Sequence, residues 1–511
     1  MTMAAKSPET SRYTETERKF EVVDSTVSPS FEGLSAVARV ERSPSQSLAA
    51  VYFDTPGRDL ARHKITLRRR TGGTDAAWHL KLPAGAETRT EIHVPLGDDE
   101  PADDPTVPES LRDVVAAIVR DRPLAPVARI NTTRVVEKLY GPGGVGIAEF
   151  CDDHVTAGAV GGDELTWREW ELELQPGGDT DVFDRLTNRL LDAGARAAGH
   201  GSKLARVLAS APDAGDSVPG ESTGAEADDP ARRAVAQHIA ELVEWDRAVR
   251  ADEWDSVHQM RVTTRKIRSL LQSSEGSFDI ADHEWILDEL RELAAVLGIA
   301  RDAEVLAERY ERALDALPEV NVRGPVRERL VEGAKKRYQT GWKRSLTAMR
   351  SQRYFRLLDA LDELVASDPP ESAAGEEPPQ LNIGSAYKRV RKAAKAARAA
   401  AGDAETGTDE SNEALHRIRK RAKALRYTAA ATAASKVADR AKAIQSLLGD
   451  HQDSVVSRTH LSRQAEVAHA AGEDTFTYGL LYQLEDDLAR RCEEQIDDAL
   501  KALDKAVAKS R

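Results

Sequence analysis

Cysteine, aromatic residues and long apolar runs are scarce in this sequence of 511 residues. Its two cysteines, Cys151 and Cys492, cannot form a disulfide framework and favour a reducing compartment. No long uninterrupted apolar run is present, and residues 1–12 are polar without a signal-peptide core, so the sequence indicates neither membrane insertion nor export. Positive charge is also in deficit, because 72 Lys and Arg stand against 86 Asp and Glu, a net charge of −14. This balance argues against a generally basic protein that coats nucleic acids, so any polyanion site must be local.

Two regions of different composition follow each other along the chain, and the change falls near residue 211. Before it, short segments alternate apolar and polar residues between Gly and Pro, a pattern typical of half-buried antiparallel strands. These segments are 50–53, 64–70, 78–82, 90–94, 145–152 and 167–174. Residues 182–193 instead place Val182, Leu186 and Leu190 along one side of a helix. After the change nearly every segment has helical periodicity, so we predict an α+β fold with more than one domain.

Two stretches divide the chain further. Residues 211–229 are rich in Pro, Gly, Ser and acids and hold few apolar groups, which predicts a flexible acidic linker. Residues 367–380, rich in Pro and Glu, separate the helical region into halves. We therefore predict a strand-rich domain at 10–210 and a helical domain at 230–511, with halves at 230–366 and 381–511.

The two helical halves resemble a repeat. Residues 257–261 read VHQMR in the first half, and residues 415–419 read LHRIR in the second. Each half then carries a Leu-Gly pair followed by an aspartate four residues after the glycine, at Asp302 and at Asp453. Two matches in the same order predict a duplicated, all-α helical bundle.

In the first region, each predicted strand has one apolar face and one charged face. Glu15, Glu17 and Lys19 share one face, whereas Phe20 and Val22 point to the other. The charged faces of the other strands carry Arg68 and Arg70, Lys81, Arg89 and Glu91, and Glu169, Glu171 and Glu173. For one strand, a solvated outer face is the simpler interpretation. However, three stacked glutamates repel one another unless a cation or arginines lie among them. Carboxylates bind hard divalent cations and Arg and Lys bind phosphate, so a barrel lined in this way suits a polyphosphate chain.

The segment Glu15-Thr16-Glu17-Arg18-Lys19 resembles the ExExK signature of the CYTH, or triphosphate tunnel metalloenzyme, family. Further pieces follow in the expected order over residues 10–210, at 52–55, 67–70, 79–81, 89–91, 129–134, 149–153, 168–174 and 202–203. The resemblance implies an N-terminal antiparallel, eight-stranded β tunnel barrel. It also implies hydrolysis of inorganic triphosphate or organic triphosphates with a divalent metal, Mg²⁺ or Mn²⁺.

The same resemblance implies roles for individual residues, with Glu15, Glu17 and Lys19 as catalytic residues. The implied metal ligands are Glu15, Glu17, Asp152, Glu169, Glu171 and Glu173. The implied phosphate ligands are Lys19, Arg68, Arg70, Lys81, Arg129, Arg134 and Lys203. Three positions stay open. Glu149 and Asp153 are alternatives to Asp152, Glu173 either binds metal or only completes the acidic face, and Arg129 is either a phosphate ligand or a surface charge at a strand end.

Basic residues form one stripe in each helical half. The first stripe is His258, Arg261, Arg265 and Arg268, and the second is His416, Arg419, Lys423 and Arg426, with steps of three and four residues that keep each set on one helix face. No acidic residue occurs at 256–274 or 415–437, so neutralising partners within the helix are absent. A solvated face, or one paired with acids of neighbouring helices, is the simpler interpretation. The duplication of the stripe favours a groove for an extended polyanion.

Together with the Leu-Gly segments, these stripes resemble the CHAD family over roughly residues 228–511. CHAD domains are all-helical and are known for binding inorganic polyphosphate. The resemblance therefore implies that both stripes bind polyphosphate.

The sequence thus predicts a metal-dependent triphosphatase, a phosphoric anhydride hydrolase, whose helical domain binds polyphosphate. The alternative is a polyphosphate-binding protein without turnover. Cyclisation of ATP is a third option, for which the sequence offers no purine pocket. No aromatic platform accompanies the basic stripes, which disfavours nucleic acid as a partner. We expect a cytoplasmic location, association with polyphosphate and no membrane partner.

Overall fold

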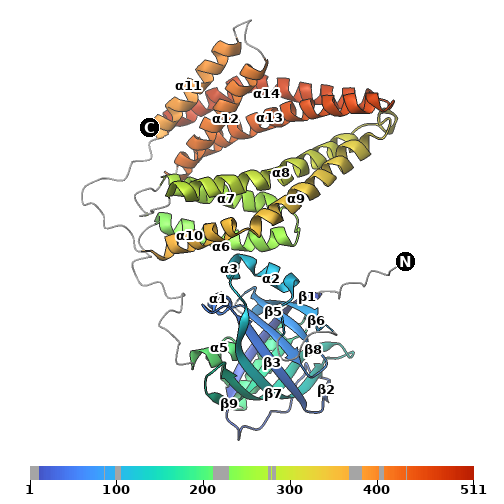
Figure 1. The fold of residues 1–511 in the computed structure, drawn as a ribbon, viewed down its shortest axis with the longest axis vertical. Helices are drawn as coiled ribbons and strands as arrows, with labels where there is room; N and C mark the ends of the chain where they lie inside the picture. The colour runs from blue at the N-terminus through green and yellow to red at the C-terminus, as the bar shows by residue number, and fades with distance from the viewer. Residues whose placement is uncertain are drawn as a thin grey trace, which may run out of the picture. The chain divides into compact units, whose positions relative to one another are not determined.

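The computed structural model describes residues 11–85, 87–97, 105–210, 230–273, 278, 283–367, 383–401, 408–432 and 434–510. The chain divides into two compact units, one made of 1–270 and 349–366 and the other of 271–348 and 367–511. The predicted linker 211–229 lies outside the described residues, as do residues 368–380 of the predicted break. Strands occupy the first part of the chain and long helices the rest (Figure 1). The predicted α+β multidomain fold is confirmed.

Eight antiparallel strands close into a barrel in the first unit. In ring order they are β1 (Ser11–Val22), β6 (Thr88–Pro95), β5 (Ala77–Pro83), β4 (Thr66–Thr71), β3 (Gln46–Asp54), β7 (Ala125–Tyr140), β8 (Gly146–Ala159) and β9 (Glu164–Leu174). The ring closes because β1 pairs first with β6 and then with β9, where Lys19 lies opposite Glu171. Two short strands extend the sheet, β2 (Arg39–Arg42) beside β7 and β10 (Arg196–Ala197) beside β1. The predicted tunnel barrel is therefore confirmed.

The outer, apolar face of the barrel is covered by helices. Trp78, Leu80 and Ile92 pack against residues of α1 (Asp59–Arg62), α2 (Glu109–Val114) and α3 (Ala116–Val119). Elsewhere Phe150 and Trp170 pack against α4 (Thr180–Asp192), which corresponds to the predicted helix 182–193. Strand side chains alternate between the two faces of a sheet. Because the apolar side chains pack under helices on the outside of the barrel, the charged side chains of the same strands point into the lumen.

A short helix, α5 (Lys203–Ala209), fills one end of the barrel interior. Its residues Leu204 and Val207 pack against Tyr52, Ile130 and Trp167, which belong to inward-facing positions of β3, β7 and β9. The side chain of Ser202 caps the helix by accepting a hydrogen bond from the Ala205 N–H at 3.0 Å. The cap fixes the start of α5, so Lys203 is held at the edge of the polar lumen.

The remaining described elements are helical. The first unit also contains α6 (Pro230–Arg250), most of α7 (Ser256–Ser273) and α10 (Gln352–Ala366). The second unit contains α8 (His283–Asp315), the short helices η2 (Glu319–Asn321) and η3 (Glu328–Glu332), most of α9 (Gly333–Met349), α11 (Ile383–Ala401), α12 (Thr408–Ala431), α13 (Ser435–Ala470) and α14 (Phe476–Lys509). One apolar core joins α11, α12, α13 and α14, and a second joins α8, η3, α13 and α14.

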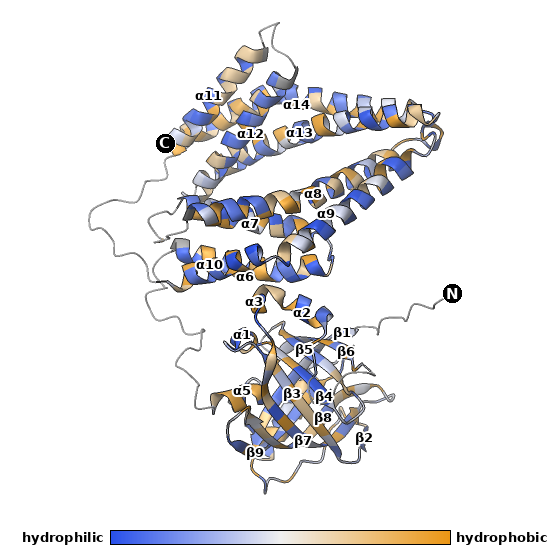
Figure 2. Ribbon diagram, in the orientation of Figure 1, coloured by the Kyte–Doolittle hydropathy of each residue, from blue (hydrophilic) through white to orange (hydrophobic). Residues whose placement is uncertain are grey.

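Polar and apolar residues are mixed along every long helix in Figure 2. Within the described residues, no helix combines the length and hydropathy that a membrane span requires.

Candidate functional site

The barrel lumen contains a cavity of about 240 Å³ whose lining is strongly charged. Its lining includes, among the residues predicted from the sequence, Glu15, Glu17, Lys19, Arg68, Arg70, Lys81, Arg134, Glu171, Glu173 and Lys203. The structure therefore brings together side chains from β1, β4, β5, β7, β9 and α5 that are far apart in the sequence.

Three carboxylates converge near α5. Single oxygens of Asp153, Glu169 and Glu171 lie within 4.8 Å of one another. Lys203 Nζ lies between them, at 2.8 Å from Asp153, 2.6 Å from Glu169 and 2.8 Å from Glu171. Arg134 donates two hydrogen bonds to Asp153, at 2.8 and 2.6 Å. Oxygens held this closely suit a hard divalent cation, and the surrounding cations keep the group charged.

The ExExK strand extends this acidic site along the lumen. Lys19 Nζ bridges Glu17 at 2.6 Å and Glu171 at 2.7 Å. Burial penalises the charge of Glu171, but Lys19, Lys203 and Arg134 outweigh it and hold its pKa well below the usual value. Burial also raises the pKa of Glu15 to about 8, against the opposing effect of Lys81. Neighbouring carboxylates on one wall thus differ in their readiness to lose a proton.

Three arginines of the lumen, Arg68, Arg70 and Arg134, repel one another. Burial and the charges of Arg68 and Arg134 lower the pKa of Arg70 to about 9. Arg68 donates to the Tyr52 hydroxyl at 3.2 Å, and Arg70 forms an ion pair with Asp75. A bound polyanion would relieve this repulsion, since Arg forms paired hydrogen bonds to phosphate oxygens.

Two positions expected in the tunnel lie outside it. The Asp152 carboxylate accepts from Arg168 at 2.8 and 2.6 Å and from the Ser28 hydroxyl at 2.6 Å, on the face opposite Asp153. The preference for Asp152 as a metal ligand was wrong, and of its alternatives Asp153 joins the carboxylate group while Glu149 lines the cavity. Arg129 is exposed and alternates with the lumen residue Ile130, so of the two roles left open for it the structure favours a surface charge over a phosphate ligand. Glu173 lines the cavity, and Glu169 belongs to the carboxylate group.

Sequence reasoning missed a polar group formed by Tyr13, His79, Glu91 and His93. Their side chains meet where β1, β5 and β6 lie side by side, with His79 opposite His93 and Tyr13 opposite Glu91. The alternation that located Lys81 also places His79 inside, and the alternation at Arg89 and Glu91 extends to His93. The strand pairing was the missing information.

The predicted basic stripes lie on α7 and α12. His258, Arg261, Arg265 and Arg268 are on α7, in the first unit, and the second stripe is on α12, in the second unit. His416, Arg419, Lys423 and Arg426 are each partly exposed. Arg419 lies against Gly449 of α13, where a Cβ atom would be 3.4 Å from its guanidinium, and Arg426 donates to Gln445 at 3.0 Å. Gly449, from the Leu-Gly pair of the second half, therefore leaves space for the side chain of Arg419.

Comparisons with known proteins agree with this division of the chain. A model of the CYTH domain matches residues 14–206, and a model of the CHAD domain matches residues 233–462. Two uncharacterized proteins of Mycobacterium tuberculosis, from strains CDC 1551 / Oshkosh and ATCC 25618 / H37Rv, are each 60% identical over 525 residues, which cover 100% of this chain and 100% of each relative.

Likeness to solved structures is weaker. PptA from Streptomyces chartreusis covers 53% of this chain and 100% of its own, with 19% identity and a TM-score of 0.42. The CHAD domain from the plant Ricinus communis covers 53% of this chain and 90% of its own, with 22% identity and a TM-score of 0.39. The two matched domains and the full-length relatives decide the family: the chain belongs to the proteins that join a CYTH domain to a following CHAD domain.

Proposed function

We propose that the CYTH barrel hydrolyses inorganic triphosphate or a related triphosphate with Mg²⁺ or Mn²⁺, and that the CHAD region binds polyphosphate. The observation that carries the hydrolytic part is the lumen itself, which combines three converging carboxylates with Arg68, Arg70 and Arg134 in one closed barrel. Such a lumen offers separate places for a divalent metal and for the phosphate oxygens.

The donor set fits a hard divalent metal. Asp153, Glu169 and Glu171 would hold it, together with Glu15 or Glu17 from the neighbouring strand β1. When bound, the metal would neutralise charge on the phosphate oxygens and lower the pKa of a coordinated water. Lys203 and Lys19 form ion pairs with oxygens of Glu171, one of these carboxylates. They would turn to the substrate when the metal takes their place.

The remaining residues would orient and stabilise the substrate. Arg68, Arg70 and Arg134 would bind the terminal phosphate oxygens and balance the charge that develops as the anhydride bond breaks. Lys81, which donates to Glu15 at 2.5 Å, would share its charge between that carboxylate and the substrate. The packing of α5 at one end of the lumen limits how far a chain can enter, which favours short or terminal phosphate segments.

Hydrolysis is tested by phosphate release from tripolyphosphate, long-chain polyphosphate, ATP and thiamine triphosphate, each with Mg²⁺ or Mn²⁺. Arg134→Met should lower kcat about 10²-fold, because it removes a preorganised charge from the lumen. Arg129→Met is the matched control on the same strand and should leave hydrolysis unchanged, since this residue is exposed outside. An absence of metal-dependent release from every substrate by the wild-type protein contradicts the hydrolytic proposal and leaves the alternative, polyphosphate binding without turnover.

Polyphosphate binding by the CHAD region is tested separately in EDTA. Arg419→Ala should weaken binding of long-chain polyphosphate, because this arginine belongs to the α12 stripe. Arg417→Ala, on the same helix but off the stripe and exposed, is the matched control. Equal affinities of the two variants would contradict the role of the stripe.

A further inference from the structure

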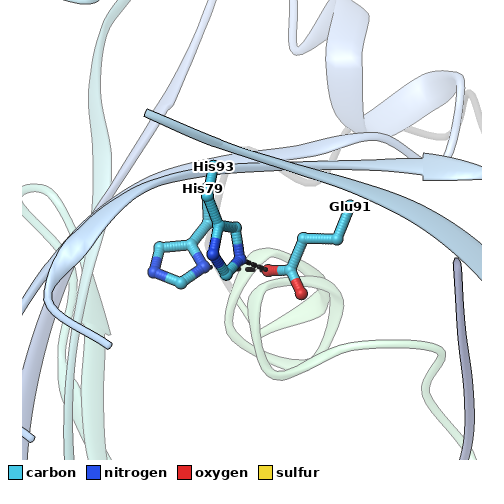
Figure 3. A group of neighbouring side chains, drawn as sticks. All are labelled: His79, Glu91 and His93. Carbon is cyan, nitrogen blue, oxygen red and sulfur yellow. Dashed lines mark hydrogen bonds and ion pairs between the residues drawn. The ribbon is translucent and has the colours of Figure 1, made fainter. Parts of the chain in front are cut away.

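A second group of metal-ligand side chains lies in the barrel, toward the start of β1. It consists of His79 from β5 and Glu91 and His93 from β6 (Figure 3). One ligand atom from each lies within 4.8 Å of the others. Tyr13, beside this group, is six residues before Lys19 on β1, or about 20 Å along a strand. The group is therefore distinct from the carboxylates gathered around Lys203 at α5.

The two imidazoles converge on one carboxylate oxygen. His79 Nδ1 lies 2.9 Å from Glu91 Oε1, and His93 Nε2 lies 3.1 Å from the same oxygen. The ring centroids are 4.0 Å apart at an interplanar angle of 64°. The side chain of His79 is fully buried, and that of His93 is 18% exposed. Two ring nitrogens and one oxygen thus face a common point at the edge of the lumen.

The hydrogen-bond partners of His79 leave one contact without a proton. Its Nε2 lies 3.0 Å from the carbonyl oxygen of Asp75, which can only accept. A neutral imidazole that donates there presents a lone pair from Nδ1 to the Glu91 carboxylate, which also only accepts. A cation bound by both atoms would satisfy both, as would a second proton on His79. In metal sites, the second ring nitrogen of a histidine ligand commonly donates to a carbonyl oxygen, which orients the ring. The Nε2 of His79 makes the same kind of contact with Asp75.

The Tyr13 hydroxyl contacts both other members of the group. It lies 2.6 Å from His93 Nε2 and 3.1 Å from Glu91 Oε2, but has one proton to donate. If the hydroxyl donates to Glu91, its oxygen accepts from the Nε2–H of His93, so Nε2 becomes a ligand only in the tautomer that carries the proton on Nδ1. Tyr13 can then hold the second carboxylate oxygen while the first binds a cation.

We propose that His79, Glu91 and His93 form a binding site for a transition-metal dication, namely Zn²⁺. Imidazole nitrogens favour zinc over magnesium, and two histidines with one glutamate, leaving the fourth position open, is a known zinc ligand set. Tetrahedral ligands about 2.1 Å from zinc are about 3.4 Å apart, so the observed separations of 2.9 and 3.1 Å need only a small opening. The nearby Lys81 and Arg68, 3.6 and 3.9 Å from the Glu91 carboxylate, would weaken but not block the cation.

The experiment measures zinc binding to the full chain, made metal-free with a chelator, in the absence of any phosphate compound. Equilibrium dialysis gives the stoichiometry, and Co²⁺ in place of zinc gives a visible spectrum that reports nitrogen ligation. His93→Ala should bind one zinc fewer than the wild type, or bind it at least 10²-fold more weakly. His154→Ala, at an exposed position of β8, should behave as the wild type does.

Two further variants sharpen the test. His79→Ala is expected to lose the same zinc, and because His79 is buried, the partly exposed His93 carries the result if that variant does not fold. Glu171→Gln should keep the zinc, since Glu171 belongs to the other group. Equal zinc stoichiometry and affinity in the wild type and in folded His93→Ala would overturn the site, as would loss of the zinc in Glu171→Gln. Neither result depends on whether the barrel hydrolyses triphosphate.

Discussion

Two neighbouring aspartates, Asp152 and Asp153, have different contacts because successive strand side chains point to opposite faces of the sheet. The Asp153 carboxylate is fully buried between Arg134 and Lys203 inside the lumen. Asp152 instead binds Arg168, which also donates to the carbonyl oxygens of Asp24 and Thr26. One aspartate therefore serves the charged site, and the other ties the chain after β1 to the outside of the barrel.

We predict that Asp153→Asn and Asp152→Asn separate hydrolysis from stability. Asp153→Asn removes a proposed metal ligand and should lower metal-dependent hydrolysis about 10²-fold. Asp152→Asn should keep that activity within about twofold but lower the stability of the fold by about 1–3 kcal/mol, because buried Arg168 loses its charged partner. Phosphate release and thermal unfolding, measured on the same samples, test both. The reverse pattern would contradict the assignment.

The sequence was sufficient wherever one face of a strand was clearly apolar. The apolar positions Phe20 and Val22 predict that Glu15, Glu17 and Lys19 point to the opposite face of their strand. Trp170 and Leu172 predict the orientation of Glu171 in the same way. On β8 acidic residues occupy both faces, at Glu149, Asp152 and Asp153, so periodicity alone could not choose among them. The His79 and His93 pair could not be found either, since only the register of β5 against β6 makes them neighbours.

At the scale of elements, α8 and α9 approach each other closely because of one glycine (Figure 1). A Cβ atom on Gly341 of α9 would lie 2.7 Å from the backbone nitrogen of Ala300 and 2.9 Å from its Cα in α8. Backbone atoms cannot move aside as a flexible side chain can. The glycine therefore sets the distance between the two helices, although glycine is a poor helix former.

We predict that Gly341→Ala destabilises the helical unit by about 1–3 kcal/mol, because the added methyl group forces the helices apart. Gly479→Ala is the matched control, since it lies inside α14 and a Cβ atom there would meet nothing within 4 Å. This control should stabilise by about 0.5–1 kcal/mol through helix propensity alone. Urea unfolding followed by circular dichroism measures both changes. Equal stability of the two variants would mean that α8 and α9 can separate without cost.

At the scale of the whole chain, the barrel shares its compact unit with helices that come much later in the sequence. Arg120, at the end of α3, is only 4% exposed, and it donates to Asp359 at 3.3 Å and to Asp362 at 2.5 Å, both on α10. Val243 of α6 packs on the apolar cluster under α2 and α3. Composition placed the start of the helical domain at residue 230, but it gave no sign of these contacts, because they join residues about 240 positions apart.

We predict that Arg120 holds α10 against the barrel. Arg120→Ala removes the ion pair to Asp362 and leaves Asp359 paired only with Arg122, and a loss of about 1.4 kcal/mol would raise local opening of α10 about tenfold. Hydrogen exchange of the full chain, followed by mass spectrometry, should show faster exchange in α10 and in α3. Arg185→Ala, an exposed arginine of α4, should leave both helices protected as in the wild type. Unchanged exchange of α10 in Arg120→Ala would mean that apolar packing and the remaining ion pairs, such as those of Arg122 with Asp359 and of Arg350 with Asp113, are enough to hold the helices. A tenfold rise confined to α3 and α10 would instead show that the Arg120 ion pairs stabilise the contact between the barrel and α10.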